Sequence, residues 1–254
     1  MVINELLHCS SRWCEGLTVW VGLSSELHDQ YDQYFEPLQD RVSLRFFETQ
    51  FLEHDRYYVK LGLVDLVEQL SPQDQFLYID YDHLVLGALD LDFNEQHTIL
   101  VSSELKELEE GVSATISKSA TLAAKVTRPH YNNSLIFSSV ATMRRVAVAW
   151  EGMYRKLDYL PPEQREEIAF CTAAEAVGEQ LIPAPSHVQE HFRDDCQASA
   201  LFHYGGSSEQ SLRLKKYLQE RAEQFSWDRI TCEDLRREHR LLQEKLVSLI
   251  PLRT

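Results

Sequence analysis

Apolar residues recur along the chain at two spacings, one typical of strands and one typical of helices. Short apolar runs predict strands at residues 17–23, 42–47, 76–79, 98–101, 135–137, 180–183 and 200–204. Apolar positions three or four residues apart predict helices at residues 3–13, 31–38, 57–70, 141–157 and 163–177. Because strands and helices alternate, we expect an α/β protein with a mixed, mostly parallel sheet flanked by helices.

The C-terminal part of the chain breaks this alternation. Residues 208–224 and 232–249 both have helical periodicity, and no strand is predicted between them. We therefore expect a main domain at residues 1–206 and a C-terminal helical extension at residues 207–254. Leu235, Leu242, Leu246 and Leu249 recur at spacings of seven, four and three, which predicts an apolar seam. We expect the seam to pack on the main domain, with a homodimer as the alternative.

Composition narrows the classes of function. The 254 residues are 44% hydrophobic, enough for a sizeable core, and their net charge of −15 disfavours binding to nucleic acids or anionic membranes. No apolar run approaches the roughly 20 residues that span a bilayer, and the N-terminus has no signal-peptide pattern, so we expect a cytoplasmic protein. Five scattered cysteines without a Cys-x-x-Cys pair favour neither a disulfide framework nor a zinc site.

Two carboxylates follow the strand predicted at residues 76–79. Asp80 and Asp82 are spaced i and i+2 where the chain leaves the sheet, and the carboxyl end of a strand is where such sheets bind ligands. Both oxygens could fold around one divalent cation, which would neutralise a diphosphate. The alternative is a pair that only caps a turn. His83 is expected to be a loop residue rather than a ligand.

Four segments support the first interpretation. They are Tyr57-Tyr-Val-Lys60-Leu61 with the following helix and FLYIDYDHLVLGAL, then Tyr131-Asn-Asn133-Ser134-Leu-Ile-Phe137, then Glu166-Glu-Ile-Ala-Phe170, and last Leu201-Phe-His203-Tyr-Gly205. In this order they resemble family 8-like glycosyltransferases, which have a GT-A fold and transfer a sugar from a nucleotide-sugar donor to a hydroxyl acceptor such as a glycan, a lipid-linked sugar or a small molecule. The resemblance covers about 150 residues and implies retention of the anomeric configuration.

The resemblance also implies roles for individual residues. The implied ligands of Mn²⁺ or Mg²⁺ on the donor diphosphate are Asp80, Asp82 and His203. The implied catalytic residues, which contact the sugars, are Asn133, Ser134, Glu166 and Glu167. The residues implied to bind the nucleotide-sugar are Lys60, Tyr81 and Gly205.

Each of these assignments has a simpler alternative. Asn133 and Ser134 could form a turn that enters a strand, Glu166 and Glu167 could stabilise a helix N-terminus, and His203 could be a core histidine. Lys60 stands where the family has an arginine, so it offers a point charge without a bidentate fork.

Two other functions are compatible with parts of the sequence. Only a short predicted helix precedes residues 17–23, so the family's first, nucleotide-binding strand is not found; this favours a non-catalytic GT-A-like binding or accessory protein. A haloacid-dehalogenase-like phosphatase also has an apolar strand followed by Asp-x-Asp. That class fits less well, because two predicted strands precede the motif and Leu84 stands where it has a threonine.

Overall fold

The computed structural model describes residues 19–24, 42–47, 60–80, 82–85, 97–106, 129–186, 188–191, 201–205, 209–223 and 232–249. The chain forms two compact units that are interleaved in sequence. The first contains Met1–Phe46, Tyr81–Leu91 and Pro185–Thr254, and the second contains Phe47–Asp80 and Asp92–Ala184. The two aspartates of the Asp-x-Asp motif therefore belong to different units.

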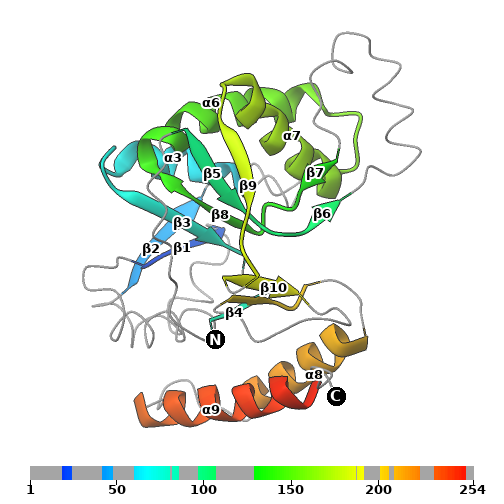
Figure 1. The fold of residues 1–254 in the computed structure, drawn as a ribbon. Coiled ribbons are helices and arrows are strands. Elements are labelled where there is room, and N and C mark those ends of the chain that lie inside the picture. Colours follow the sequence, from blue (N-terminus) through cyan, green and yellow to red (C-terminus); the bar gives the residue numbers. More distant parts are fainter. Residues whose placement is uncertain are drawn as a thin grey trace. The chain divides into compact units, whose positions relative to one another are not determined.

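A four-stranded sheet is central to the second unit (Figure 1). Its order is β3 (Gln75–Ile79), β8 (Leu135–Ser139), β5 (Thr98–Val101) and β9 (Gln180–Pro183). β8 is antiparallel to β3 and β5, whereas β5 and β9 are parallel, so three strands share one direction and β8 opposes them. The predicted mixed sheet of an α/β protein is confirmed; three of its four strands run in one direction, although only the β5–β9 pairing is parallel.

Three helices lie on the same side of this sheet: α3 (Leu63–Gln69), α6 (Val140–Lys156) and α7 (Pro162–Ala176). α6 begins after Ser139, whose hydroxyl oxygen accepts a hydrogen bond from the Thr142 amide at 3.1 Å and so caps the helix. The buried rings of Trp150 on α6 and Phe170 on α7 meet edge to face, with centroids 5.0 Å apart. This aromatic pair joins α6 to α7, the helix that carries Glu166 and Glu167.

A short hairpin-like pair packs against α7. Its strands are β6 (Leu105–Lys106) and β7 (His130–Tyr131), which are antiparallel. No apolar pattern marks either strand, and neither was expected from the sequence. Their importance is that they present Lys106 and His130 to α7.

The first unit contains two small sheets. β10 (Gln189–His191) runs parallel to β11 (Leu201–His203), and β11 runs antiparallel to β4 (His83–Val85). The second sheet pairs β1 (Val19–Ser24) with β2 (Val42–Phe47), close to the strands predicted at residues 17–23 and 42–47.

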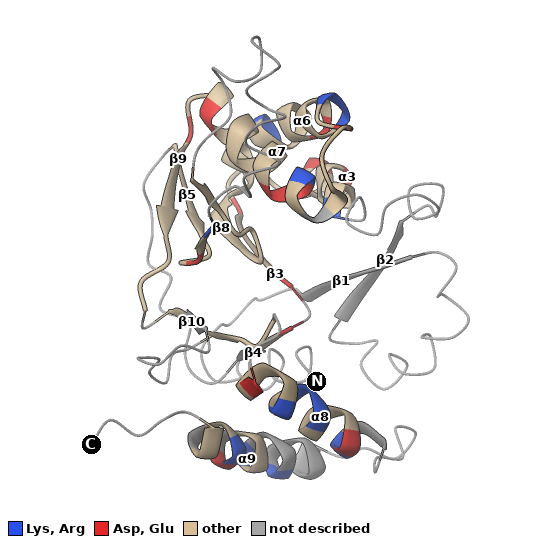
Figure 2. Cartoon of the chain, turned by 90° about the vertical axis from the view of Figure 1, so that its right-hand side faces the viewer, with Lys and Arg blue, Asp and Glu red and all other residues tan. Residues whose placement is uncertain are grey.

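The C-terminal helices α8 (Glu209–Glu223) and α9 (Cys232–Leu249) share an apolar cluster with β11. Its buried members are Phe202 of β11, Leu214 of α8, and Leu242 and Leu246 of α9. Two members of the predicted leucine seam are thus buried within the chain, and the homodimer alternative gains no support from them. Figure 2 shows acidic and basic residues interspersed along both helices.

Some predicted elements lie outside the described residues, among them the helices at residues 3–13 and 31–38. The helix predicted at residues 57–70 is shorter, because residues 60–62 form a 3₁₀ turn before α3. Among the described residues, no helix combines the length and the apolar character needed to cross a membrane.

Candidate functional site

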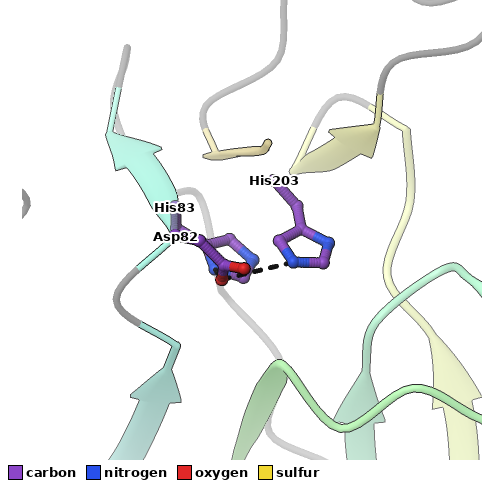
Figure 3. Close-up of side chains that lie close together, drawn as sticks. All are labelled: Asp82, His83 and His203. Atoms are coloured by element: carbon purple, nitrogen blue, oxygen red, sulfur yellow. Dashed lines mark ion pairs between the residues drawn. The ribbon is translucent and has the colours of Figure 1, made fainter. Parts of the chain in front are cut away.

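Asp82, His83 and His203 form a compact cluster in the first unit (Figure 3). Strands β4 and β11 are antiparallel with His83 directly opposite His203, so both imidazoles leave the same face of the sheet. The two rings stack, with centroids 4.6 Å apart and planes 13° apart. Oδ1 of Asp82 lies 3.3 Å from Nε2 of His203 and 3.8 Å from Nδ1 of His83. One carboxylate oxygen therefore faces a nitrogen from each ring.

The expectation that His83 is a loop residue is wrong. It is the first residue of β4 and is 0% exposed. Its Nε2 atom lies 2.7 Å from Nε2 of Gln189, a side chain of β10 that is also 0% exposed. Three adjacent strands thus contribute to the cluster: β4 supplies His83, β11 supplies His203 and β10 supplies Gln189.

Gly205 approaches this cluster too closely to carry a side chain. A Cβ atom at this position would lie 2.7 Å from Oδ2 of Asp82 and would overlap the imidazole of His203. The backbone around it is held by two hydrogen bonds: the Tyr204 amide donates to the Asp82 carbonyl at 3.0 Å, and the Ser211 hydroxyl donates to the Gly205 carbonyl at 3.1 Å. The absence of a side chain at Gly205 leaves the space that the cluster occupies.

The donor atoms of Asp82, His83 and His203 suit a divalent cation. One ligand atom from each residue lies within 4.8 Å of the other two. Oδ1 of Asp82 is buried and accepts no hydrogen bond of good geometry from the described residues, so this oxygen keeps a coordination position available. Burial opposes ionisation of Asp82, but the imidazoles of His203 and His83 outweigh it and hold the pKa of this carboxyl below its usual range.

A second polar cluster, in the second unit, is centred on Lys60. Its Nζ atom donates to Oδ1 of Asn133 at 3.0 Å, and it lies 3.0 Å from Oδ2 of Asp80 and 3.2 Å from Oε2 of Glu166. An ammonium has three N–H donors, and here it has three oxygen acceptors. The other oxygen of Asp80 accepts a hydrogen bond from the Tyr78 hydroxyl. Lys60 therefore holds together Asp80, which directly follows β3, Glu166 of α7 and Asn133, which precedes β8.

Burial and the neighbouring charges together set the protonation of this cluster. It raises the pKa of Glu166 to about 7, although Lys60 and the Asn133 amide, which donates to Glu166, act in the opposite direction. Burial lowers the pKa of Lys60, but Glu166 and Asp80 outweigh it, so the net shift is upward. Glu166 is therefore poised to gain or lose a proton near neutral pH while Lys60 stays charged.

Ser134 makes two hydrogen bonds through its backbone in this unit. Its amide donates to Oδ1 of Asn132 at 2.6 Å, and its carbonyl accepts from the amide of Asp80 at 2.8 Å. These bonds tie the turn before β8 to the end of β3. The Ser134 hydroxyl oxygen is buried and has no hydrogen-bond partner among the described residues. A ligand hydroxyl could supply that partner.

Glu167, on α7, forms a separate charged group with two residues of the β6–β7 pair. Its carboxylate lies 2.7 Å from Nζ of Lys106 and 3.3 Å from Nε2 of His130. Burial would raise the pKa of Glu167, but His130 and Lys106 outweigh it and lower the pKa. One helical turn later, the Cys171 thiol lies 3.5 Å from the Tyr131 carbonyl, and burial raises its pKa to about 12. Such a thiol is unreactive.

The residues predicted from the sequence thus fall into two groups. Asp82, His203 and Gly205 are together in the first unit, and Lys60, Asp80, Asn133, Ser134, Glu166 and Glu167 are in the second. Tyr81 lies outside the described residues. Glu166 and Glu167 lie in the second turn of α7, so they do not cap its N-terminus.

Four contributing residues were not expected: Tyr78, Lys106, His130 and Gln189. Tyr78 could have been found from the strand pattern, because it is spaced i and i+2 with Asp80. Lys106, His130 and Gln189 lie on strands of two or three residues, too short for a periodic signal.

No protein-family profile and no curated protein matches this chain. Among solved structures, the chain is similar to the galactosyltransferase LgtC in complex with donor and acceptor sugar analogues, at 12% identity and a TM-score of 0.48 over 80% of this chain and 96% of that one. An active-site mutant of LgtC matches at 10% identity over the same shares of the two chains, with a TM-score of 0.48. Mouse xyloside xylosyltransferase 1 in its apo form matches at 9% identity and a TM-score of 0.47, over 74% of this chain and 83% of that one.

Proposed function

We propose that this protein is a divalent-cation-dependent glycosyltransferase that moves a sugar from a nucleoside-diphosphate donor to a hydroxyl acceptor, with retention of configuration. The observation that supports this most is the pairing of Asp82, from the Asp-x-Asp segment, with His203. Oδ1 of Asp82 is buried, has no hydrogen-bond partner among the described residues, and lies 3.3 Å from Nε2 of His203. We assign Asp82 and His203 to Mn²⁺ or Mg²⁺. Asp80 is the predicted third ligand from the sequence resemblance, and Lys60 and Tyr78 bind its oxygens in the structure.

The chemistry explains why such a donor needs these groups. As the bond to the anomeric carbon breaks, negative charge develops on the diphosphate leaving group, and a divalent cation would neutralise it when bound. Asn133 and the Ser134 hydroxyl are proposed to hydrogen-bond the sugar near that carbon. Glu166 is proposed to orient a sugar hydroxyl, and its pKa of about 7 lets it accept or donate a proton there. Glu167 is proposed to fix the position of α7 next to Glu166, through its contacts with Lys106 and His130.

The test is binding of sugar nucleotides with and without metal. The chain is titrated calorimetrically with UDP-, GDP-, ADP- and CMP-sugars in the presence and absence of MnCl₂. We expect one donor to bind only with Mn²⁺ and to stabilise the protein by about 2.7 kcal/mol at 100 times its dissociation constant. Asp82→Ala and Asp80→Ala should abolish the metal-dependent part. Asp65→Asn, on the exposed side of α3, is the matched control.

Turnover separates the candidate functions. Release of nucleoside diphosphate that depends on a hydroxyl acceptor supports the transferase, and metal-dependent binding without release across an acceptor panel supports the non-catalytic alternative. Equal nucleotide binding by the wild type and both aspartate variants, with and without metal, would contradict the cation site. Phosphate release from a phosphomonoester would instead indicate a phosphatase.

A further inference from the structure

His83 has surroundings that a structural histidine does not need. Its two ring nitrogens face two different polar side chains: Nδ1 lies 3.8 Å from Oδ1 of Asp82, and Nε2 lies 2.7 Å from the amide nitrogen of Gln189. Both His83 and Gln189 are 0% exposed. A buried glutamine at the far edge of an imidazole fixes the rotation of that ring, and so fixes where its other nitrogen points.

The other ring nitrogen of His83, Nδ1, faces the same carboxylate oxygen as Nε2 of His203 does. Nε2 of His203 lies 3.3 Å from Oδ1 of Asp82, while the two rings stack nearly parallel (Figure 3). Donor atoms bound to one ion at about 2.1 Å stand roughly 3.0–3.4 Å apart. The separations of 3.3 Å and 3.8 Å are close to this range, and one ligand atom from each of the three residues lies within 4.8 Å of the other two. Because an imidazole lone pair lies in the plane of its ring, the His83 ring must turn out of its stack with His203 for all three donors to meet one ion.

The geometry points to His83 Nδ1 as a further protein ligand of the divalent cation, next to Asp82 and His203, with Gln189 as the residue that positions it. This inference rests on the proposed cation site and adds a second nitrogen to it. When Nδ1 gives its lone pair to the ion, the ring proton resides on Nε2, which then donates to the side-chain oxygen of Gln189. The amide of Gln189 presents either its oxygen or its nitrogen after half a turn, so it serves both tautomers.

A nitrogen-rich set of ligands has a consequence for the choice of metal. Mg²⁺ is a hard cation that prefers oxygen ligands and dehydrates reluctantly. Imidazole nitrogens instead suit first-row transition metals. Two imidazoles and one carboxylate should therefore favour Mn²⁺ over Mg²⁺ by at least about tenfold in affinity.

The most direct test counts nitrogens on the bound ion. The full-length protein, prepared with ¹⁵N-histidine, is loaded with MnCl₂ alone and examined by pulsed electron paramagnetic resonance. We expect hyperfine couplings from two histidine nitrogens. A single histidine coupling would overturn the inference about His83 while leaving the Asp82 and His203 site in place. No Mn²⁺ binding at all would remove both that site and this inference.

Variants provide the second readout, the Mn²⁺ and Mg²⁺ affinities measured by calorimetry. His83→Gln should weaken Mn²⁺ binding by about 10- to 100-fold and Mg²⁺ binding by less, which narrows the ratio between them. Gln189→Met should weaken Mn²⁺ by about tenfold, whereas Gln189→Glu, which keeps an acceptor for Nε2–H, should restore it.

The control is a histidine outside the cluster. The His97 side chain is 65% exposed and its residue has a φ of 66°, a conformation that asparagine tolerates, so His97→Asn should leave both affinities unchanged. If His83→Gln folds and its ratio of Mn²⁺ affinity to Mg²⁺ affinity equals that of the wild type, the inference is contradicted. If that variant does not fold, the wild-type spectrum decides.

Discussion

The ammonium of Lys60 and the carboxylate of Glu166 lie 3.2 Å apart, with the lysine side chain 13% exposed and the glutamate side chain 1% exposed. The same ammonium lies 3.0 Å from Asp80, so one positive charge faces two carboxylates. Removing one partner of a buried ion pair destabilises the folded protein strongly, because the remaining charge is then buried without a partner.

Replacing Lys60 tests this dependence. Lys60→Met should lower the free energy of unfolding by about 3–5 kcal/mol, because Glu166 and Asp80 lose their common partner. Adding Glu166→Gln to that variant should recover part of the loss. Chemical denaturation of both single variants and the double variant gives the coupling energy. A loss below about 1 kcal/mol in Lys60→Met, in the range of an exposed pair, would contradict the buried arrangement.

Glu166 should make stability depend on pH in the opposite sense to an ordinary salt-bridged carboxylate. Its pKa of about 7 in the folded protein exceeds the usual value of 4.5. Between these values the folded protein holds a proton that the unfolded chain has lost. The contribution of Glu166 to the free energy of unfolding is therefore complete below the usual pKa of 4.5 and is lost as the pH rises through about 7. Glu166→Gln should remove this loss when unfolding is followed from about pH 5 to about pH 8.

Glu167→Gln is the matched variant on the next residue. His130 and Lys106 lower the pKa of Glu167. Its contribution to the free energy of unfolding is therefore present above the usual pKa of a glutamate and is lost as the pH falls through the lowered pKa. Removing it should therefore change the acid side of the stability curve. Equal pH profiles for the two variants would refute the opposite assignments.

Gly205 should tolerate no side chain. A methyl group there would overlap His203 and come within 2.7 Å of Oδ2 of Asp82, so Gly205→Ala should displace the cluster and weaken Mn²⁺ binding by at least about tenfold. Gly152 is the control, because a Cβ on it meets nothing within 4 Å. Gly152→Ala, inside α6, should instead raise stability by about 0.5–1 kcal/mol and leave metal binding unchanged. Thermal unfolding and calorimetry on the two variants provide both quantities.

The leucine seam should respond as a core and not as an interface between subunits. Leu242 is 2% exposed and packs with Phe202 and Leu214, so Leu242→Asp should unfold the C-terminal helices. Leu212 on α8 is 55% exposed, and Leu212→Asp should change stability by no more than about 0.5 kcal/mol. Circular dichroism and light scattering distinguish the outcomes. A folded Leu242→Asp protein that changes only from dimer to monomer would support the dimer instead.

The sequence predicts the elements of this fold well where a repeating apolar pattern exists. The strands at Val42–Phe47, Thr98–Val101 and Gln180–Pro183 and the helix at Cys232–Leu249 begin and end where predicted. Such segments bury a continuous side or stripe, and burial is what produces periodicity. The strand at Gln189–His191 has polar residues only, and its glutamine is buried because it meets another polar side chain, so hydropathy gives no sign of it.

The site residues divide along similar lines. Asp82, Asn133 and Glu166 were predicted because they stand in segments with a family pattern, and the structure shows what surrounds each of them. The proximity of His83 to His203 could not be predicted, because it depends on the pairing of strands 120 residues apart in sequence. Likewise, the three acceptors around Lys60 come from separate elements, so their number follows from tertiary packing and not from spacing.

The thiol of Cys171 has a use that follows from its burial. It sits on α7 against the Tyr131 carbonyl, and a pKa of about 12 leaves almost no thiolate at neutral pH. An alkylating reagent can modify Cys171 only while α7 and the β6–β7 pair are separated. In the folded chain the reagent cannot reach the buried sulfur, and the thiol is not ionised. In a chain whose other cysteines are replaced, the rate at which Cys171 is modified therefore reports how often α7 and the β6–β7 pair separate beside Glu167.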